Sequence, residues 1–289
     1  MTVDNASTAT SAPTLTAGQG IDLAARGITQ AQSFASGRTD NPTYGGQAGI
    51  GIQFVENRLI AQIEGADAAN ATIDAEDLSV EALTRSYSGE YDNQSRFGVF
   101  ASSGVGGGGD DDGGVGIAGA IALGINEVNQ TLATVGDNNS LDLSGDLTIT
   151  AVNDTEVKVV ADGSSEAHAA ADELFAVMMD DNSTSDTEDP EVSGGTLGIG
   201  ASVAVATHKN VTRAKLATGA GCVGVNNPDN ITVSADQTST TETEGKAAGA
   251  GSISLVPLAS VSVARNTAQA IIESGAAITA QGNISVSSQ

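Results

Sequence analysis

Two groups of acidic residues are the part of this sequence best suited to chemistry. One is a triplet of aspartates between runs of glycine, and the other lies in a Ser- and Thr-rich segment at residues 180–191. Clustered carboxylates on flexible backbone suit Ca²⁺, which takes several oxygen ligands in loose geometry. The candidate calcium ligands are Asp110, Asp111, Asp112, Asp180, Asp181, Asp186, Glu188 and Asp189.

The same acidic segments also fit a simpler interpretation as solvated loop tips. Neither has the spacing of an EF-hand or the glycine-aspartate nonapeptide of calcium β-rolls. Runs of like charge on Gly- and Ser-rich backbone are typical of solvent-exposed chain. Calcium is therefore the one cofactor that we consider, and solvation is the alternative.

No other residues combine into a recognisable reactive site. Cys222 is the only cysteine, so an intramolecular disulfide is impossible, and its strand-like surroundings indicate a small buried thiol. His168 and His208 are too isolated for a histidine-led zinc site. The segment Gly114–Gly119 has the spacing of a dinucleotide fingerprint but lacks the preceding strand and following helix that the fingerprint requires.

An enzyme acting on polysaccharides is the main catalytic alternative, because parallel β-helices host such enzymes. That chemistry needs two carboxylates about 5 to 10 Å apart, or calcium with a basic residue in a groove. The outward strand positions are expected to be Thr, Ser, Asn and Gln, and Arg85 and Arg96, near the acidic triplet, are the only basic residues of interest. We therefore predict no enzymatic activity and assign no catalytic residue.

Charge excludes two classes of partner. The chain has 36 acidic and 11 basic residues, for a net charge of −25. Nucleic acid needs Lys and Arg to displace counterions, and an anionic membrane surface attracts basic segments. The longest apolar stretch, residues 113–125, is rich in glycine and too short to span a bilayer. No secretory signal is recognisable, so a signal for export would lie elsewhere in a longer gene.

An internal repeat is the strongest pattern in the sequence. An Asn is followed by Ala four residues later and by an apolar residue two positions further on, and a glycine comes soon after. The pattern occurs four times, and the apolar residues are Ile63, Val135, Leu216 and Ile272. The repeated asparagines are Asn57, Asn129, Asn210 and Asn266.

The flanks of these asparagines predict β-strands. Each Asn is preceded by small and apolar residues in alternation, as in Ala201-Ser-Val-Ala-Val, and each copy ends on a strand such as Ile231-Thr-Val-Ser-Ala. Alternation with period two is typical of a half-buried strand, and β-branched residues favour that backbone. Aromatic residues are 3% of the chain, so the core is expected to be stacked aliphatic residues. The repeated Asn suits a corner, where it could bond along a ladder of equivalent residues.

The spacing of the asparagines predicts several coils in each repeat. Successive copies are 72, 81 and 56 residues apart, which is long for one coil. We expect two or three coils of about 20 to 25 residues and a rod on the order of 60 Å along the stack. The chain forms a single segment, 1–289, with repeat boundaries near 1–25, 26–82, 83–151, 152–235 and 236–289.

The variation in length falls at one point of the repeat. It lies between the strand that ends at Ala25, Ala82, Ala151 or Ala235 and the next glycine-rich entry. Insertions at one point project from one face of a solenoid. Residues 167–179, within the longest insertion, could form a helix or an alternating strand.

The two ends of the sequence are alike. Residues 15–25 read like residues 278–288, the tail of another copy, so neither end looks capped. An uncapped coil exposes unpaired strand edges and an apolar interior. We therefore expect each end to meet another copy of the chain or the rest of a longer array.

With these motifs assembled, the sequence resembles repeats of large bacterial exoproteins of the filamentous-haemagglutinin and leukotoxin-type filamentous adhesin kind. The resemblance rests on Ala201-Ser-Val-Ala-Val, Asn210 to Gly219, Ala259-Ser-Val-Ser-Val and Asn266 to Ser288. It implies an all-β, right-handed parallel β-helix, a β-solenoid at the bacterial cell surface or outside the cell. It also implies a role in adhesion, aggregation or cell-to-cell contact, with surface glycans or proteins of host or neighbouring cells as partners. The alternative is a surface-layer or extracellular-matrix protein that assembles laterally.

Overall fold

The computed structural model describes residues 2–3, 14–39, 44–64, 71–85, 93–105, 114–137, 139–163, 197–217, 224–249, 253–273 and 278–289. These residues form eighteen strands joined by turns, and they contain no helix. The prediction of an all-β chain is confirmed. Both acidic segments, residues 167–179, His168 and Cys222 lie outside the described residues.

Three sheets contain these strands. Sheet A is built of β1 (Thr2–Val3), β5 (Tyr44–Ile63), β9 (Val115–Val135), β12 (Leu197–Leu216), β15 (Ile253–Leu255) and β16 (Leu258–Ile272). Sheet B is built of β2 (Thr14–Thr16), β6 (Ala71–Ala75), β10 (Asn139–Leu143), β13 (Gly224–Asn226) and β17 (Ile278–Thr279). Sheet C is built of β3 (Ile21–Gly27), β4 (Gln30–Thr39), β7 (Leu78–Thr84), β8 (Ser95–Val105), β11 (Leu147–Asp162), β14 (Ile231–Lys246) and β18 (Ile284–Ser288).

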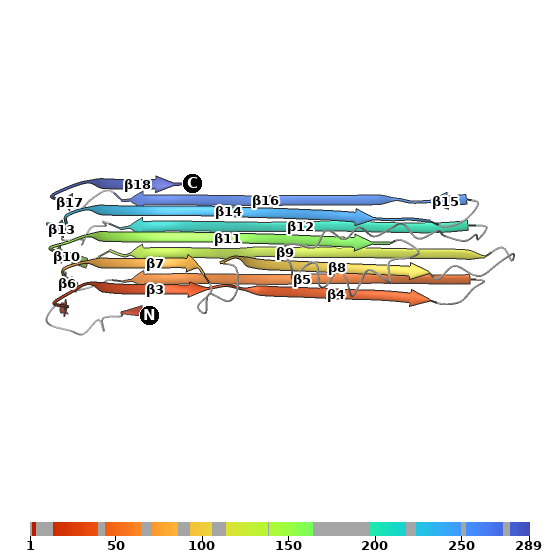
Figure 1. Ribbon diagram of the computed structural model, residues 1–289, viewed down its shortest axis with the longest axis horizontal. Coiled ribbons are helices and arrows are strands. Elements are labelled where there is room, and N and C mark those ends of the chain that lie inside the picture. Colours follow the sequence, from red (N-terminus) through yellow and green to blue (C-terminus); the bar gives the residue numbers. More distant parts are fainter. Residues whose placement is uncertain are drawn as a thin grey trace.

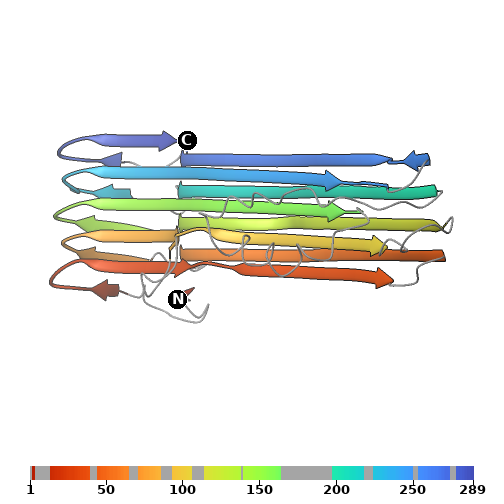
Figure 2. The ribbon, with the colours of Figure 1, turned by 45° about the vertical axis from the view of Figure 1, so that its right-hand side comes forward.

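The chain visits the sheets in a fixed cyclic order. It passes from sheet B to sheet C to sheet A and then returns to sheet B one level further along the stack. Every strand pair is parallel. Figures 1 and 2 show the coils lying one above another, with the short strands of sheet B at one end. This winding is consistent with the predicted β-solenoid.

One repeat makes one coil, so the prediction of two or three coils in each repeat is wrong. Asn57 pairs with Asn129, Asn129 with Asn210, and Asn210 with Asn266, each on neighbouring strands of sheet A. Ala25, Ala82, Ala151 and Ala235 are likewise in register in sheet C. The error came from assuming short strands, because β5 and β12 contain 20 residues each and β9 contains 21.

The molecule is consequently long across its stack rather than along it. A strand of 20 residues spans about 65 Å, whereas five stacked levels span about 24 Å. In Figure 1 the longest axis runs parallel to the strands of sheets A and C. The predicted rod of about 60 Å along the stack is wrong, because the longest dimension of the molecule lies along its strands.

Part of the supposed insertions is also regular strand. The segments after Ala25 and Ala82 contain β4 and β8, and β11 and β14 continue through Ala151 and Ala235 without interruption. These stretches lengthen sheet C opposite the long strands of sheet A. The sequence between the end of this lengthened sheet and sheet A is where the copies differ most.

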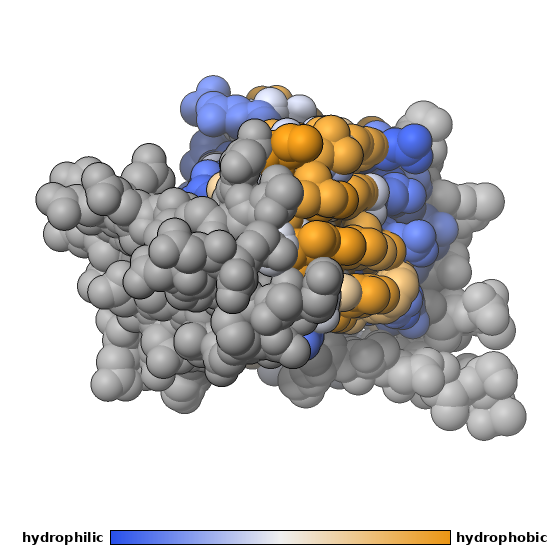
Figure 3. Space-filling model, turned by 90° about the vertical axis from the view of Figure 1, so that its right-hand side faces the viewer, coloured by the Kyte–Doolittle hydropathy of each residue, from blue (hydrophilic) through white to orange (hydrophobic). Residues whose placement is uncertain are grey.

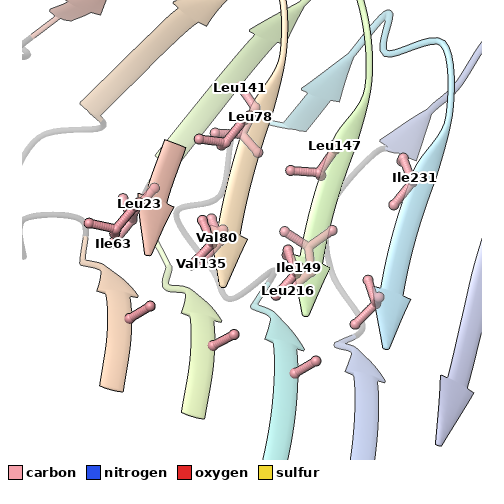
Figure 4. Close-up of a cluster of buried hydrophobic side chains, with 14 of the residues drawn as sticks. Leu23, Ile63, Leu78, Val80, Val135, Leu141, Leu147, Ile149, Leu216 and Ile231 are labelled. Atoms are coloured by element: carbon pink, nitrogen blue, oxygen red, sulfur yellow. The ribbon is translucent and has the colours of Figure 1, made fainter. Parts of the chain in front are cut away.

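The core narrows from one end of the coil to the other. Near sheet B, large residues such as Leu147, Ile149 and Leu216 fill the space between the sheets, and Figure 4 shows them pointing inward from successive strands. Further out, the facing residues are Ala and Val, as with Val159 and Ala204, except for Phe97. The taper explains how the chain forms a core with few aromatic residues.

Glycine occupies the inward positions where sheets A and C approach most closely. A Cβ added to Gly49 would lie 2.1 Å from the carbonyl oxygen of Ser102, and one added to Gly163 would lie 2.0 Å from that of Ala201. No L side chain fits at either position. The glycine-rich entries noted in the sequence therefore set the spacing of the sheets.

Small residues point inward and large ones outward over the first half of each long strand in sheet A. In β9, Ala120 and Ala122 are buried, whereas Ile117 and Ile121 are 47% and 37% exposed. In β12, Ala204 and Ala206 are buried, and Val203 is exposed. The expectation that outward strand positions would be Thr, Ser, Asn and Gln is wrong for this sheet.

Candidate functional site

The repeated asparagines form a continuous ladder of hydrogen bonds inside the molecule. The side-chain amide of Asn57 donates to Oδ1 of Asn129 at 3.0 Å, Asn129 donates to Asn210 at 2.8 Å, and Asn210 donates to Asn266 at 2.8 Å. Below them, the hydroxyl of Thr29 donates to Oδ1 of Asn57 at 2.9 Å. Each amide therefore passes a hydrogen bond to the equivalent amide of the next coil.

The ladder runs through the middle of sheet A, not along a corner. Asn129 and Asn210 are fully buried within β9 and β12, so the interpretation of these residues as corner residues is wrong. The corner does contain asparagine, but at other positions. Asn227, in the turn after β13, has a left-handed backbone with φ of 58°.

Polar side chains of sheet C complete this buried layer. The amide of Asn129 also donates to the hydroxyl of Thr155 at 2.8 Å, and that of Asn210 to Ser239 at 3.1 Å. On the other side of Thr155, its hydroxyl donates to Asn153, whose amide donates to Gln237 at 3.0 Å. Together they separate the large-residue core near sheet B from the small-residue core further out.

Sequence reasoning missed these partners on sheet C. The available signal was the interruption of an inward alternation, because Leu147, Ile149 and Ala151 are followed at the same parity by Asn153 and Thr155. Recognising it requires knowing that the strand continues past Ala151.

His208 belongs to the same polar layer. It lies in register with Asn126 of the previous coil and is 3% exposed. Its Nε2 lies 3.2 Å from the hydroxyl of Ser239 and 3.3 Å from that of Thr241. Burial lowers the pKa of His208 below its ordinary value, so the neutral ring is the form that fits the interior.

A second ladder lies at the turn between sheets B and C. Oδ1 of Asp77 accepts from the backbone N–H of Asp146 at 2.7 Å, and Oδ1 of Asp146 accepts from that of Asn230 at 3.1 Å. Oδ1 of Asn230 accepts in turn from the N–H of Asn283 at 3.0 Å. Each turn is therefore held by a side chain of the coil before it.

The arginines considered for catalysis have structural surroundings. Arg96 forms an ion pair with Glu156, its partner in register on β11, at 3.1 Å. Arg85 is exposed and directly follows β7.

The described acidic residues do not assemble a metal site. A hollow of about 490 Å³ beside sheet B is lined by Asp74, Glu76 and Asp142, together with Ala17, Gly18, Ala75, Leu143, Ser144, Asn227 and Gln281. Within the described ranges, no three His, Cys, Asp or Glu side chains gather closely enough to hold a metal ion. The candidate calcium ligands lie outside these ranges, so that hypothesis stays a prediction.

The last described coil leaves the interior open. Leu147 and Ile231 are fully buried, whereas Ile284, at the equivalent position of β18, is 51% exposed. Val286 is 48% exposed, and its register partner Val233 is fully buried. β16 and β18 each pair with a described strand on one side only.

Neither the fold nor the sequence leads to a known relative. The part of the chain that the structure describes has no helix with the length and hydropathy needed to cross a membrane. Comparison with protein-family models, curated proteins and solved structures finds no match.

Proposed function

We propose that this chain is a structural, adhesive segment of a filament at the bacterial cell surface or outside the cell. Its coils would form a right-handed parallel β-solenoid, and its role would be adhesion, aggregation or cell-to-cell contact. Surface glycans or proteins of host or neighbouring cells would be its ligands. The resemblance of its repeats to filamentous adhesins supports this assignment, and the arrangement of its last coil supports it independently.

The open edge of the last coil is the observation that carries the proposal. Ile284 and Val286 occupy positions that are buried in every interior coil, yet about half of each side chain is exposed. Exposed apolar side chains and unpaired strand edges favour the addition of another strand. A further coil, from a second copy or from a longer chain, would bury both.

The described contacts between coils also support a structural role. Its two hydrogen-bond ladders and its cross-coil ion pairs join each coil to the next. Such contacts stabilise the stack itself. We accordingly propose that the chain is not an enzyme.

A matched pair of substitutions in β18 tests end-to-end stacking. Val286 points inward and its neighbour Ser287 points outward, because inward and outward positions alternate along a strand. Val286→Lys would bury an unpaired charge in any added coil, whereas Ser287→Lys changes the net charge equally and leaves the edge apolar.

Sedimentation velocity over a range of protein and salt concentrations provides the measurement. The unmodified chain and Ser287→Lys should associate, more strongly at high salt because salt screens the charge of −25. Val286→Lys should remain smaller at every concentration. A monomeric unmodified chain under all conditions would overturn the stacking proposal.

A second candidate is a surface-layer or matrix protein that assembles side by side. The exposed apolar residues of sheet A favour it, because a filament that bonds only through its ends has no use for them. Negative-stain electron microscopy distinguishes fibres from sheets.

A further inference from the structure

The first half of sheet A presents an uncharged outer surface, which we call the apolar face. It comprises the outward residues of β5 from Gly46 to Phe54, of β9 from Val115 to Ile125, of β12 from Leu197 to Thr207, and of β15 and β16 from Ile253 to Val263. The strand register places equivalent residues in rows, such as Ile50, Ile121 and Val203. Figure 3 shows such rows stacked as one broad hydrophobic area at the end where these strands begin.

The apolar face is large for the surface of a single molecule. Ten of its large side chains are between 37% and 74% exposed: Ile50, Ile52, Phe54, Ile117, Ile121, Val203, Ile253, Leu255, Val261 and Val263. At about half exposure, they present on the order of 800 Å² of apolar surface, about what one partner contributes to a stable interface. The largest patch of a typical monomer is about 300 to 600 Å².

The residues beyond the apolar face make this side of the molecule unusual in charge. Further along the same strands, the outward side chains and the residues directly after β5 and β16 include five basic groups, Arg58, Lys209, Arg213, Lys215 and Arg265, and four acidic groups, Glu56, Glu64, Glu127 and Glu273. Five minus four gives a described local charge of +1 on a chain whose net charge is −25. Two copies therefore repel each other least when these sides meet.

The chemistry of the apolar face narrows the choice of partner. Its described outward positions are almost all aliphatic or glycine, and the polar groups among these side chains are limited to the hydroxyl of Thr207. A saccharide would find few hydrogen-bond partners and few aromatic platforms there. A flat sheet of regular aliphatic rows is best matched by another such sheet, since inner faces of this kind interdigitate at about 10 Å.

We infer that the apolar face is the interface between two copies of this chain, packed sheet on sheet. The pair would be isologous, with the same rows contributed by each copy. Packing would bury Ile121 and Val203 near its centre and leave the basic border in water. This contact uses a different surface from end-to-end stacking, so either proposal can fail without the other.

The test uses a chain whose ends are blocked. In the Val286→Lys background, we expect a concentration-dependent dimer in sedimentation equilibrium. Adding Ile121→Lys and Val203→Lys, which are neighbours in register, should raise the dissociation constant about 100-fold or more, because each copy would bury two unpaired charges.

A matched control carries the same charges on the opposite sheet. Thr148 and Thr232 are also neighbours in register and point outward from sheet C. With Thr148→Lys and Thr232→Lys in the same background, the dimer should persist unchanged. Circular dichroism and thermal unfolding establish that all variants keep the fold.

A spin label supplies a readout that loss of folding does not mimic. In a Cys222→Ser background, a nitroxide on Ile121→Cys should show intermolecular dipolar broadening, since facing sheets lie about 10 Å apart. The same label on Thr148→Cys should not. A monomeric Val286→Lys chain, or equal spectra at both sites, would overturn the inference and leave another partner, such as a lipid surface, for the apolar face.

Discussion

Asn129 illustrates how a buried polar residue can be fully used. Its amide nitrogen donates to Asn210 and Thr155 and its oxygen accepts from Asn57, so three hydrogen bonds are made at a position with no exposure. Two residues later on the same strand, Thr131 is equally buried, yet its hydroxyl has no hydrogen-bond partner among the described residues. The two positions should therefore respond in opposite ways to substitution.

Isosteric changes separate these two cases. Asn129→Asp replaces a donor by an acceptor and introduces a buried charge, and we expect it to lower the free energy of unfolding by about 3 kcal/mol or more. Thr131→Val removes only an unpaired hydroxyl and should raise it by about 1 kcal/mol. Urea denaturation measures both, and equal effects of the two substitutions would contradict the assigned hydrogen bonds.

His208 makes the stability of the fold depend on pH. Because burial lowers its pKa, the unfolded chain binds a proton at a higher pH than the folded chain does. The stability associated with the neutral ring is complete above about pH 6.5 and is lost as the pH falls below that value towards the folded pKa.

The variant His208→Asn isolates this contribution, since Asn126 occupies the register position one coil earlier. Other groups titrate alike in both proteins, so the difference between them reports His208. Between about pH 6.5 and pH 5, we expect the unfolding free energy of the unmodified chain to fall more steeply with pH than that of His208→Asn. The difference in slope should correspond to the binding of at most one proton on unfolding. Parallel pH profiles would contradict a neutral buried ring.

At the scale of the strands, the taper of the core determines which residues each position accepts. Gly49 faces inward where the sheets are closest, whereas an added Cβ on Gly119 would meet no atom within 4 Å. Both are strand glycines in sheet A, in β5 and β9. They form a natural matched pair.

Alanine substitutions test the taper. Gly49→Ala would force a methyl group against the carbonyl of Ser102, and we expect a loss of about 3 kcal/mol or more. Gly119→Ala should change the unfolding free energy by at most about 0.5 kcal/mol, or raise it, because alanine restricts the unfolded chain. Thermal unfolding followed by circular dichroism compares the two, and similar midpoints would show that the sheets can separate.

The strands also explain what sequence could and could not predict. The alternation of residue types along the sequence predicted the strands. The repeated asparagines, Asn57, Asn129, Asn210 and Asn266, predicted which residues of neighbouring coils lie in register. Hydropathy alone could not predict which side chains of a strand point into the core. The distance between the two sheets decides this, and the sheets are so close that the smaller Ala204 points inward and the larger Val203 points outward.

The repeated asparagine lies elsewhere than the sequence predicts for a related reason. Asparagine commonly occupies turns, so its local preference favours a corner. The ladder overrides that preference, because an amide buried inside a strand can both donate and accept between coils. The sequence could not predict the hydroxyl of Thr155 and the amide of Asn153 as partners of the ladder. Both belong to the part of sheet C beyond Ala151, where the sequence predicts an insertion and not a strand.

As a whole, the molecule is a thin slab with two different kinds of open surface. Its last coil presents unpaired backbone and an exposed interior, and the apolar face presents side chains alone. Edge addition extends the hydrogen-bonded stack, whereas face packing doubles its thickness. A particle that used both would grow as a paired ribbon.

The side-chain ladder has one more consequence for such a particle. From Asn57 to Asn266, every described hydrogen bond between the asparagines is donated towards the C-terminal coil. The turn ladder is donated the other way, so this direction belongs to the asparagine ladder and not to the dipole of the whole stack. A filament of these chains would be polar, in the sense that its two ends would differ. Its two tips would offer an incoming chain a donor at one and an acceptor at the other, and would elongate at different rates.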